Sequence, residues 1–319
     1  MSAKRPPSRL KLDAGPADQG AALVEFIARR GGISLEESRV AIERGGAFLR
    51  GKRERAAEAR IAKGDRVEVV LRERGDLPAV PTALGKERIL RLDSQILALD
   101  KPAGVTAQEG RAGGESLLDL AAALLASLGE DPRALLVHRL DRGTTGVTVL
   151  ARTRAAQRAL LEEFREGRAE KEYRALVHGK VALDEGEIAL PLGADPVAPG
   201  RRRVVPGGPG SPGSEEAFTR YRVVERFGEV ATLLAGMPRT GRTHQLRVHF
   251  QSLGHPLLGD ARYGGPQSIT RQDGTRQDFA RPLLHALSLR LRFPPGSALT
   301  LRAPEPADFA SALSFLRER

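Results

Sequence analysis

Asp141 occupies the centre of the segment H-R-L-D-R-G at residues 138–143, with Arg139 and Arg142 beside it in the sequence. Apolar runs at 134–137 and 147–151 flank this segment and are typical of strands, and the Asp-Arg-Gly triplet is a turn signal. Because nearby cations favour the charged form of a carboxyl group, we expect Asp141 to be ionised. An ionised acid in a loop between rigid elements could act in catalysis. The alternative is a turn aspartate that accepts hydrogen bonds from backbone amides.

A second polar segment, T-G-R-T-H-Q-L-R-V-H-F from residue 240, has the spacing of a short helix. Thr243 is predicted as its N-cap, and Leu246, Phe250 and Leu253 recur at helical intervals as a buried face. Arg247 lies one step away from that face. We therefore expect its guanidinium to reach a cleft.

These two segments and four others follow one another in an order that resembles the RluA-type pseudouridine synthases, over roughly residues 89 to 310. The matching fragments are K-P-A-G at 101–104, H-R-L-D-R-G-T-T-G at 138–146, K-E-Y at 171–173, G-R-T-H-Q-L-R-V-H at 241–249, G-D-A-R-Y-G at 259–264 and L-H-A at 284–286. The sequence departs from the family pattern at Thr145, where serine is usual, and at Pro294, where histidine is usual. Neither departure touches a group expected to do chemistry.

The resemblance implies an enzyme that isomerises uridine to pseudouridine in RNA without a cofactor or a metal. It makes Asp141 the catalytic carboxylate, acting either as a nucleophile or as a base, because both routes need an ionised acid. Arg247 would hold and orient this acid through a charge-assisted hydrogen bond. Tyr173 would stack on the uracil. From the residues alone, Tyr173 could instead be a core aromatic, because it alternates with apolar residues of the same strand.

Further cleft residues follow from the same resemblance. The expected substrate-binding residues are His138, Arg139, Arg242, His244 and Gln245. The histidines could also be imagined as metal ligands, but their spacing fits no regular zinc motif and the chain has no cysteine. We therefore predict no metal site.

Composition agrees with a polyanionic partner. The chain of 319 residues has 51 Lys and Arg against 40 Asp and Glu, a formal net charge of +11. No apolar run approaches the length of a membrane span, and the N-terminus lacks the apolar core of a secretory signal. We expect a cytoplasmic protein with no membrane contact.

The first 74 residues have the pattern of a small α/β domain. Residues 1–15 are basic and are predicted to form a disordered arm, and residues 16–74 read as two helices followed by short strands. This order resembles a small RNA-binding module of ribosomal proteins. The basic residues expected to bind RNA are Arg39, Arg44, Arg50, Lys52 and Arg53. The alternative is a capping subdomain whose charges are only solvated.

Residues 75–88 contain glycine and proline and are predicted as a linker, followed by a catalytic domain at 89–319. Strands outnumber helices in this domain and do not alternate regularly with them. We therefore predict an α+β fold, with flanking helices on a mixed, largely antiparallel sheet.

The expected partner is RNA, with large-subunit ribosomal RNA first and tRNA second, and the protein is expected to act as a monomer. A competing hypothesis is a non-catalytic RNA-binding factor in ribosome assembly. Asp141 discriminates between the two, because a pure binder has no need of a carboxylate facing a polyanion.

Overall fold

The computed structural model describes residues 9–43, 46–70, 81, 83–107, 116–198, 200–208 and 210–318. The chain divides into two compact units, one formed by its N-terminal part up to Arg74 and the other by most of the remaining residues. Within the described ranges, no helix is both long and apolar enough to cross a membrane.

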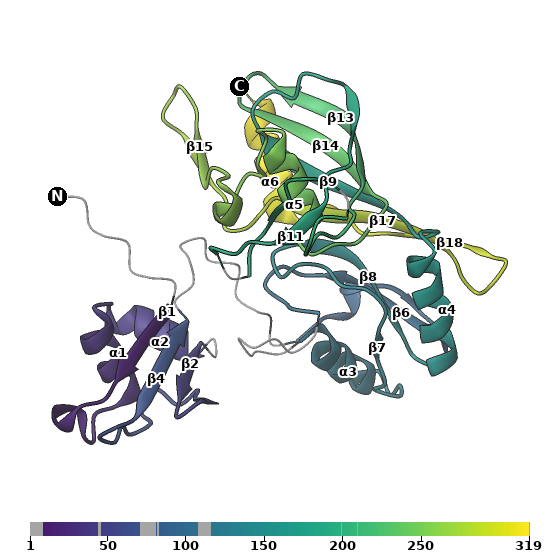
Figure 1. Cartoon of the computed structure of the whole chain (residues 1–319). Coiled ribbons are helices and arrows are strands. Elements are labelled where there is room, and N and C mark those ends of the chain that lie inside the picture. Colours follow the sequence, from purple (N-terminus) through teal and green to yellow (C-terminus); the bar gives the residue numbers. More distant parts are fainter. Residues whose placement is uncertain are drawn as a thin grey trace. The chain divides into compact units, whose positions relative to one another are not determined.

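The N-terminal unit packs two helices on an antiparallel sheet with strand order β1-β4-β2-β3 (Figure 1). Its elements are β1 Arg9–Asp13, the 3-10 helix η1 Pro16–Asp18, α1 Leu23–Gly31, α2 Leu35–Glu43, β2 Ala47–Leu49, β3 Lys52–Arg53 and β4 Arg66–Val70. Leu23, Phe26 and Ile27 of α1 are fully buried and meet Val67 and Val69 of β4 in one core. The helices and strands predicted here are therefore confirmed.

The prediction of a disordered arm over residues 1–15 is wrong for residues 9–13, which form β1. Leu10 and Leu12 alternate with polar residues, and Leu10 pairs with Val69 of β4 and is buried. This alternation is the signature of a half-buried strand, but it is short and follows a basic, proline-containing start. Residues 1–8 lie outside the described ranges.

The larger unit is built on a ten-stranded sheet with order β10-β13-β14-β9-β17-β8-β6-β5, in which β18 also pairs with β17 and β7 with β8. Its strands are β5 Ile89–Leu92, β6 Ile96–Lys101, β7 Leu135–Leu136, β8 Thr145–Ala151, β9 Glu170–His178, β10 Glu185–Ile188, β13 Thr219–Phe227, β14 Ala231–Pro238, β17 Leu284–Arg292 and β18 Ala298–Arg302. Among the described strands of this sheet, β8 and β17 pair in parallel and the other pairs are antiparallel. The predicted mixed, largely antiparallel α+β fold is confirmed.

Two small hairpins stand apart from this sheet. They are β11 Leu192–Ala194 with β12 Arg202–Val204, and β15 Ser268–Thr270 with β16 Arg276–Asp278.

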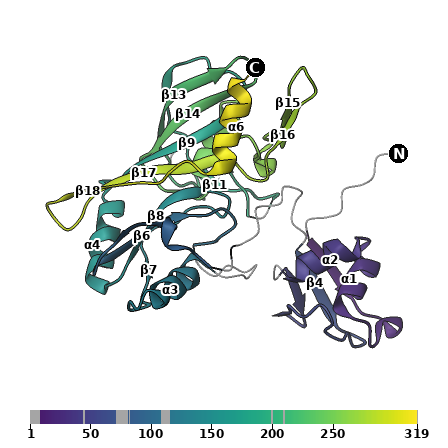
Figure 2. The same cartoon turned by 180° about the vertical axis from the view of Figure 1, so that it is seen from behind.

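Helices cover both faces of the sheet (Figures 1 and 2). They are α3 Leu117–Ser127, α4 Arg154–Arg165, α5 Gln245–Ser252 and α6 Ala307–Arg317, with the 3-10 helices η2 Lys86–Arg88 and η3 Ala261–Tyr263. On one half of the sheet, α3 packs against Leu97 and Leu99 of β6, whereas the α4 face is lined by Ile96 and Ala98. Successive strand residues point to opposite faces, so α3 and α4 lie on opposite sides. The other half repeats this arrangement, with α5 and α6 on opposite faces.

The predicted linker at 75–88 is partly wrong. Leu84 is buried in the core beneath α3, and residues 86–88 form η2, so the folded part of the larger unit begins before residue 89. Leu84 lies in a segment whose apolar residues are interrupted by glycine and proline and have no helical or strand period, so the sequence pattern did not reveal its burial. Residues 75–80 and 82 lie outside the described ranges.

The middle of the sheet brings together segments that are distant in the sequence. Ala286 of β17 pairs with Gly146 of β8 on one side and with Tyr173 of β9 on the other. A Cβ at Gly146 would collide with the carbonyl oxygen of Ala286, so this close approach requires glycine there. The turn that carries Asp141 comes immediately before β8. It is therefore held near Tyr173.

Candidate active site

A cleft of about 520 Å³ opens in the larger unit where the Asp141 turn, the start of β9 and the start of α5 meet. All eight cleft residues predicted from the sequence line it: His138, Arg139, Asp141, Tyr173, Arg242, His244, Gln245 and Arg247. Asp141 is the one carboxylate among the described lining residues. The structure thus brings together a single acid and a set of polar and aromatic groups.

Asp141 begins a turn in which the N–H of Thr144 donates to the Asp141 carbonyl at 3.0 Å. The arginines nearest to it in sequence turn to other partners: Arg142 Nε donates to the Gly104 carbonyl at 2.7 Å, and Arg139 Nη2 to Thr243 Oγ1 at 3.3 Å. The Asp141 carboxylate also contacts Arg247 of α5. The expectation that Arg139 and Arg142 favour the charged form of Asp141 stays a prediction.

Arg247 on α5 is the cation that contacts Asp141, with Nη1 3.4 Å from Oδ2. Its other nitrogens are held more tightly: Nε and Nη2 donate to the two carboxylate oxygens of Asp260 at 2.7 and 2.8 Å. Burial opposes the charge of Arg247, but Asp260 and Asp141 together raise the pKa of its guanidinium above the ordinary value. Arg247 is therefore positively charged, and its hydrogen bonds to Asp260 orient Nη1 toward Asp141.

The backbone at the start of α5 differs from the prediction. The N-cap is His244, in the left-handed conformation with φ of 59°, and not Thr243. Leu253 is 41% exposed, so it does not extend the buried face of Leu246 and Phe250. Gln245 organises this loop: its Oε1 accepts from Thr240 Oγ1 at 2.7 Å and from the Arg242 N–H at 3.0 Å. The helical hydrogen bonds therefore begin at the His244 carbonyl, one residue later than a Thr243 cap would place them.

His244 presents one ring nitrogen to the cleft. Its Nδ1 lies 2.8 Å from Tyr263 Oη, and that oxygen already accepts the N–H of Arg202. The phenol hydrogen can donate to Nδ1, and in that arrangement the ring hydrogen is on Nε2, 4.0 Å from Asp141 Oδ2. Burial lowers the pKa of His244 to about 4, so the ring is neutral near pH 7.

Aromatic groups form another wall of the cleft. Tyr173 lines the cleft from β9 and also packs against the core beneath α5. Its environment is thus partly that of a cleft residue and partly that of a core aromatic. Burial raises the pKa of its phenol, which is therefore neutral. His138 stacks on Phe164 with ring centroids 4.7 Å apart, and its Nε2 accepts the N–H of Val149 at 3.0 Å. Burial lowers the pKa of His138 to about 3, so its ring is neutral as well.

Sequence reasoning gave no role to two charged groups that bear on this site. Asp260 was visible as the acid of the G-D-A-R-Y-G fragment, but its bond to Arg247 could not be read from the sequence. Lys171, from the K-E-Y fragment, lines the cleft two residues before Tyr173.

Over the described ranges, no group of three or more His, Asp or Glu side chains is arranged to hold a metal ion. His249, His255 and His285 each bond to a separate protein partner.

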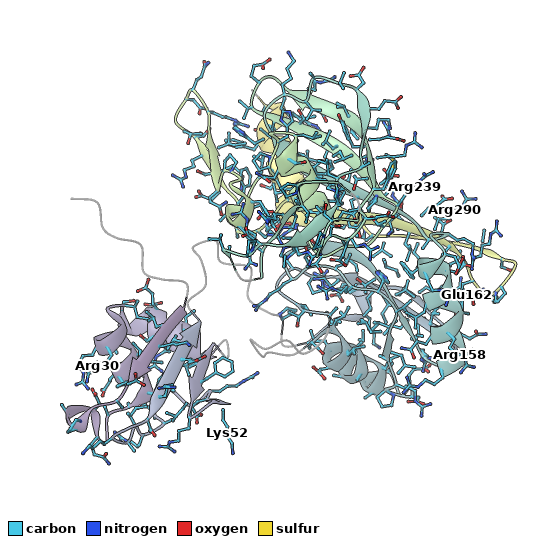
Figure 3. The ribbon with its side chains drawn as sticks, viewed as in Figure 1. Arg30, Lys52, Arg158, Glu162, Arg239 and Arg290 are labelled. Atoms are coloured by element: carbon cyan, nitrogen blue, oxygen red, sulfur yellow. The ribbon has the colours of Figure 1, made fainter. Side chains whose placement is uncertain are left out.

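In the N-terminal unit, the predicted RNA-binding residues differ in their environment. Arg39 on α2 and Lys52 on β3 have exposed side chains, and Lys52 extends from the ribbon in Figure 3. Arg50 is exposed as well, but it is held by Asp65 through two hydrogen bonds of 2.7 and 2.8 Å. Arg44 and the side chain of Arg53 lie outside the described part of the chain. RNA binding by this set stays a prediction, in which Arg39, Arg50 and Lys52 are the members with exposed, described side chains.

Comparisons with known proteins agree with the fold. The sequence profile of the RNA pseudouridylate synthases matches residues 95–252. The chain is 38% identical to ribosomal large subunit pseudouridine synthase D of Nitrosomonas europaea, over 72% of this chain and 65% of that protein. It is also 38% identical to the dual-specificity RNA pseudouridine synthase RluA of Escherichia coli, over 69% of this chain and 93% of that protein. Among solved structures, human RNA pseudouridylate synthase domain containing 4 matches with a TM-score of 0.59 at 27% identity, covering 72% of this chain and 93% of that one.

Proposed function

The chain belongs to the RNA pseudouridylate synthases, a family of isomerases, and from this premise we propose that it converts specific uridines of large-subunit ribosomal RNA to pseudouridine, with Asp141 as the catalytic carboxylate. In this reaction the bond from the ribose to a ring nitrogen of uracil breaks, the base turns while bound, and a ring carbon takes over the bond. That carbon loses its hydrogen as a proton, and the freed nitrogen takes up a proton. The exchange is redox-neutral. The proposal therefore calls for no cofactor and no metal.

The observation that carries the proposal is the position of Asp141. It is the one carboxylate among the described residues of the cleft, and Arg247, fixed by Asp260, faces it at 3.4 Å. A carboxylate in this position can attack the anomeric carbon as a nucleophile or remove a proton from the neighbouring sugar carbon as a base. Both routes use the same ionised group, and both stay open in the proposal.

We assign the other cleft residues to binding the uridine and the RNA backbone. Tyr173 would stack on the uracil, which needs a new aromatic neighbour once it leaves its own stack. His244 would donate a hydrogen bond from Nε2 to the sugar or the base beside Asp141. Arg139 and Arg242 would contact RNA phosphates, and Gln245, whose amide is taken up by the protein, would hold the loop that carries Arg242.

The choice of large-subunit ribosomal RNA rests on the name of the Nitrosomonas relative, and tRNA is the second choice. Action as a monomer stays a prediction. A substrate of this kind would be met in the cytoplasm.

The test is to map pseudouridines in ribosomal RNA and tRNA from a strain lacking the gene, and from the same strain complemented with the wild-type protein or the Asp141→Asn variant. We expect one or a few large-subunit uridines to lose the modification and to regain it only with the wild-type protein. Loss of sites in tRNA alone would transfer the proposal to tRNA. An unchanged map in both RNAs would favour a non-catalytic RNA-binding factor.

A further inference from the structure

Lys171 is a partly buried cation on the wall of the cleft without a carboxylate partner. Its Nζ donates to the carbonyl of Thr240 at 3.0 Å, which uses one of its three hydrogens. Among the described residues no Asp or Glu forms an ion pair with it, whereas exposed Lys180 pairs with Glu229 at 2.9 Å. Burial lowers the pKa of Lys171 to about 8, so most of the protein carries a charged ammonium there near pH 7.

An ammonium withdrawn from water without a counter-ion is unfavourable unless another group compensates its charge. The cleft does not supply that group, because its described lining includes one acid and six cationic side chains. The cations are Arg139, Arg165, Lys171, Arg239, Arg242 and Arg247. An anion bound from solution would complete the coordination of Lys171.

Several of these cations are already paired within the protein. Arg165 contacts Glu166, Arg242 lies 3.8 Å from Glu215, and Arg247 is held by Asp260. Arg239 has no acidic partner in the described structure. It follows β14, next to Thr240, with its guanidinium over the ring of Phe218 at 5.3 Å and its side chain exposed (Figure 3). Lys171 and Arg239 therefore lie on either side of the loop at Thr240, and among the described residues neither has an acidic partner.

Space is open beside the ammonium. Gly241 follows Thr240, and a Cβ built on it would meet just one atom within 4 Å, Lys171 Nζ at 4.0 Å. Lys171 and Tyr173 lie on the same face of β9, two residues and so roughly 7 Å apart along the strand. That spacing is comparable to the distance from a nucleobase to the phosphates of its own nucleotide.

We infer that Lys171, with Arg239 beside it, forms a subsite for a backbone phosphate of the RNA, next to the nucleotide whose base reaches Tyr173. This inference rests on the proposed function for the identity of that nucleotide. The phosphate replaces the missing counter-ion of Lys171, and its position sets how far the ribose enters toward Asp141. This contact would fix the position of the RNA backbone in the cleft and would not depend on the base sequence.

The first experiment measures the salt dependence of binding to an unmodified transcript of large-subunit ribosomal RNA, which requires no turnover. The variants are Lys171→Met, Lys171→Arg and, as a matched lysine outside the cleft, Lys180→Met. We expect Lys171→Met to weaken binding roughly tenfold and to make the slope of log K against log salt shallower by about 0.7–0.9. Lys171→Arg and Lys180→Met should keep nearly the wild-type slope. A wild-type slope for Lys171→Met would overturn the inference.

The second experiment locates the phosphate. Stem-loops that carry the target uridine are made with one neutral methylphosphonate at each flanking position in turn, and their affinities for the wild type and Lys171→Met are compared. We expect one position to weaken binding of the wild type roughly tenfold and to have no further effect on Lys171→Met. If every position affects the two proteins equally, Lys171 contacts no phosphate and the inference fails.

Gly241→Val provides a variant that keeps the lysine and fills the space beside it. We expect it to lose sensitivity to the same methylphosphonate as Lys171→Met does, and full sensitivity would count against the subsite. The inference and the proposed function can fail separately. A protein that makes no pseudouridine but shows the change in salt slope would refute the function and keep the subsite, and the reverse result would refute the subsite alone.

Discussion

Asp260 holds Arg247 more closely than Asp141 does, through two hydrogen bonds of 2.7 and 2.8 Å against a single contact of 3.4 Å. The Asp260 side chain is fully buried, and Arg247 also lies over the ring of Tyr263, with 4.9 Å between the guanidinium carbon and the ring centroid. The guanidinium is thus fixed before any substrate arrives. Asp141 receives an oriented positive charge without being tied into a bidentate pair, which leaves its carboxylate free for chemistry.

This arrangement predicts that Asp260→Asn lowers the turnover rate more than it lowers RNA affinity. The amide can accept one hydrogen bond but no longer balances the charge of Arg247, so the arginine moves toward Asp141 and pairs with it. We expect the single-turnover rate to fall roughly tenfold to a hundredfold, by analogy with the partners that orient metal ligands. Single-turnover kinetics and RNA binding on the same protein measure the two effects separately.

Asp278→Asn is the matched control, because Asp278 forms an exposed ion pair with Arg276 at 2.7 Å. Exposed pairs contribute about 0–1 kcal/mol, whereas breaking a buried pair costs about 3–5 kcal/mol. Asp260→Asn should therefore also lower the free energy of unfolding, and Asp278→Asn should change neither quantity. Equal turnover in the two variants would remove Asp260 from the support of the site.

Asp141→Asn is expected to lower the isomerisation rate by at least about a hundredfold, because the amide can act neither as a nucleophile nor as a base. RNA affinity should stay the same or rise slightly, since a negative charge facing a polyanion is removed. Release of tritium from C5-labelled uridine measures the first effect, and filter binding the second. A variant that retained a comparable rate would contradict the assignment of Asp141.

Arg281 connects the Asp141 turn to the C-terminal helix α6. Its Nη1 donates to the Gly143 carbonyl at 3.1 Å, and Nε and Nη2 donate to Asp308 at 2.6 and 2.9 Å. Asp308→Ala should free Arg281 and loosen the turn, so we expect a lower single-turnover rate with nearly unchanged RNA affinity. Arg317→Ala removes another ion pair of α6, to Glu225, that does not contact the turn. If both variants lost the same fraction of activity, the effect would belong to the helix and not to the turn.

Local features of the sequence predicted much of the fold. Ser116 and Thr153 each precede an apolar helical pattern, and their side-chain oxygens cap α3 and α4 by accepting a backbone amide of the first turn. The Asp141 turn, Tyr173 and Arg247 were found because each lies in a fragment that resembles a family motif. Their convergence in one cleft, however, depends on the pairing of β17 with both β8 and β9. Such long-range register leaves no periodic signal in the chain.

The errors have separate physical reasons. Leu253 was expected to extend the buried face of α5 because it has helical spacing, but spacing alone does not show where a helix meets solvent. Asp260 and Arg281 could not be assigned roles, since their partners are distant in the chain. His244 was missed as the N-cap because left-handed backbone is uncommon outside glycine.

The buried histidines predict sensitivity to acid. The pKa of His138 is lowered to about 3 by burial, with a smaller effect from Lys171, whereas the ordinary value is 6.5. Between these two values the unfolded chain binds a proton that the folded protein does not, so stability falls as the pH decreases from about 6.5. His138→Gln should therefore flatten the decline between pH 7.5 and pH 5, by at most about 2 kcal/mol. Urea unfolding at several pH values tests this, and identical slopes would contradict a neutral, buried His138.

Deleting residues 1–74 is expected to weaken RNA binding while leaving the larger unit folded. The hydrophobic core of the N-terminal unit is formed by residues 10–69, and the largest core clusters of the larger unit begin at Leu84, so neither core loses a member when the chain is cut between them. The deletion removes exposed cations such as Arg39 and Lys52, and each lost phosphate contact makes the slope of log K against log salt shallower by about 0.7–0.9. Thermal unfolding should still show a cooperative transition. A truncated protein with the affinity and salt slope of the full chain would mean that the N-terminal unit takes no part in binding RNA.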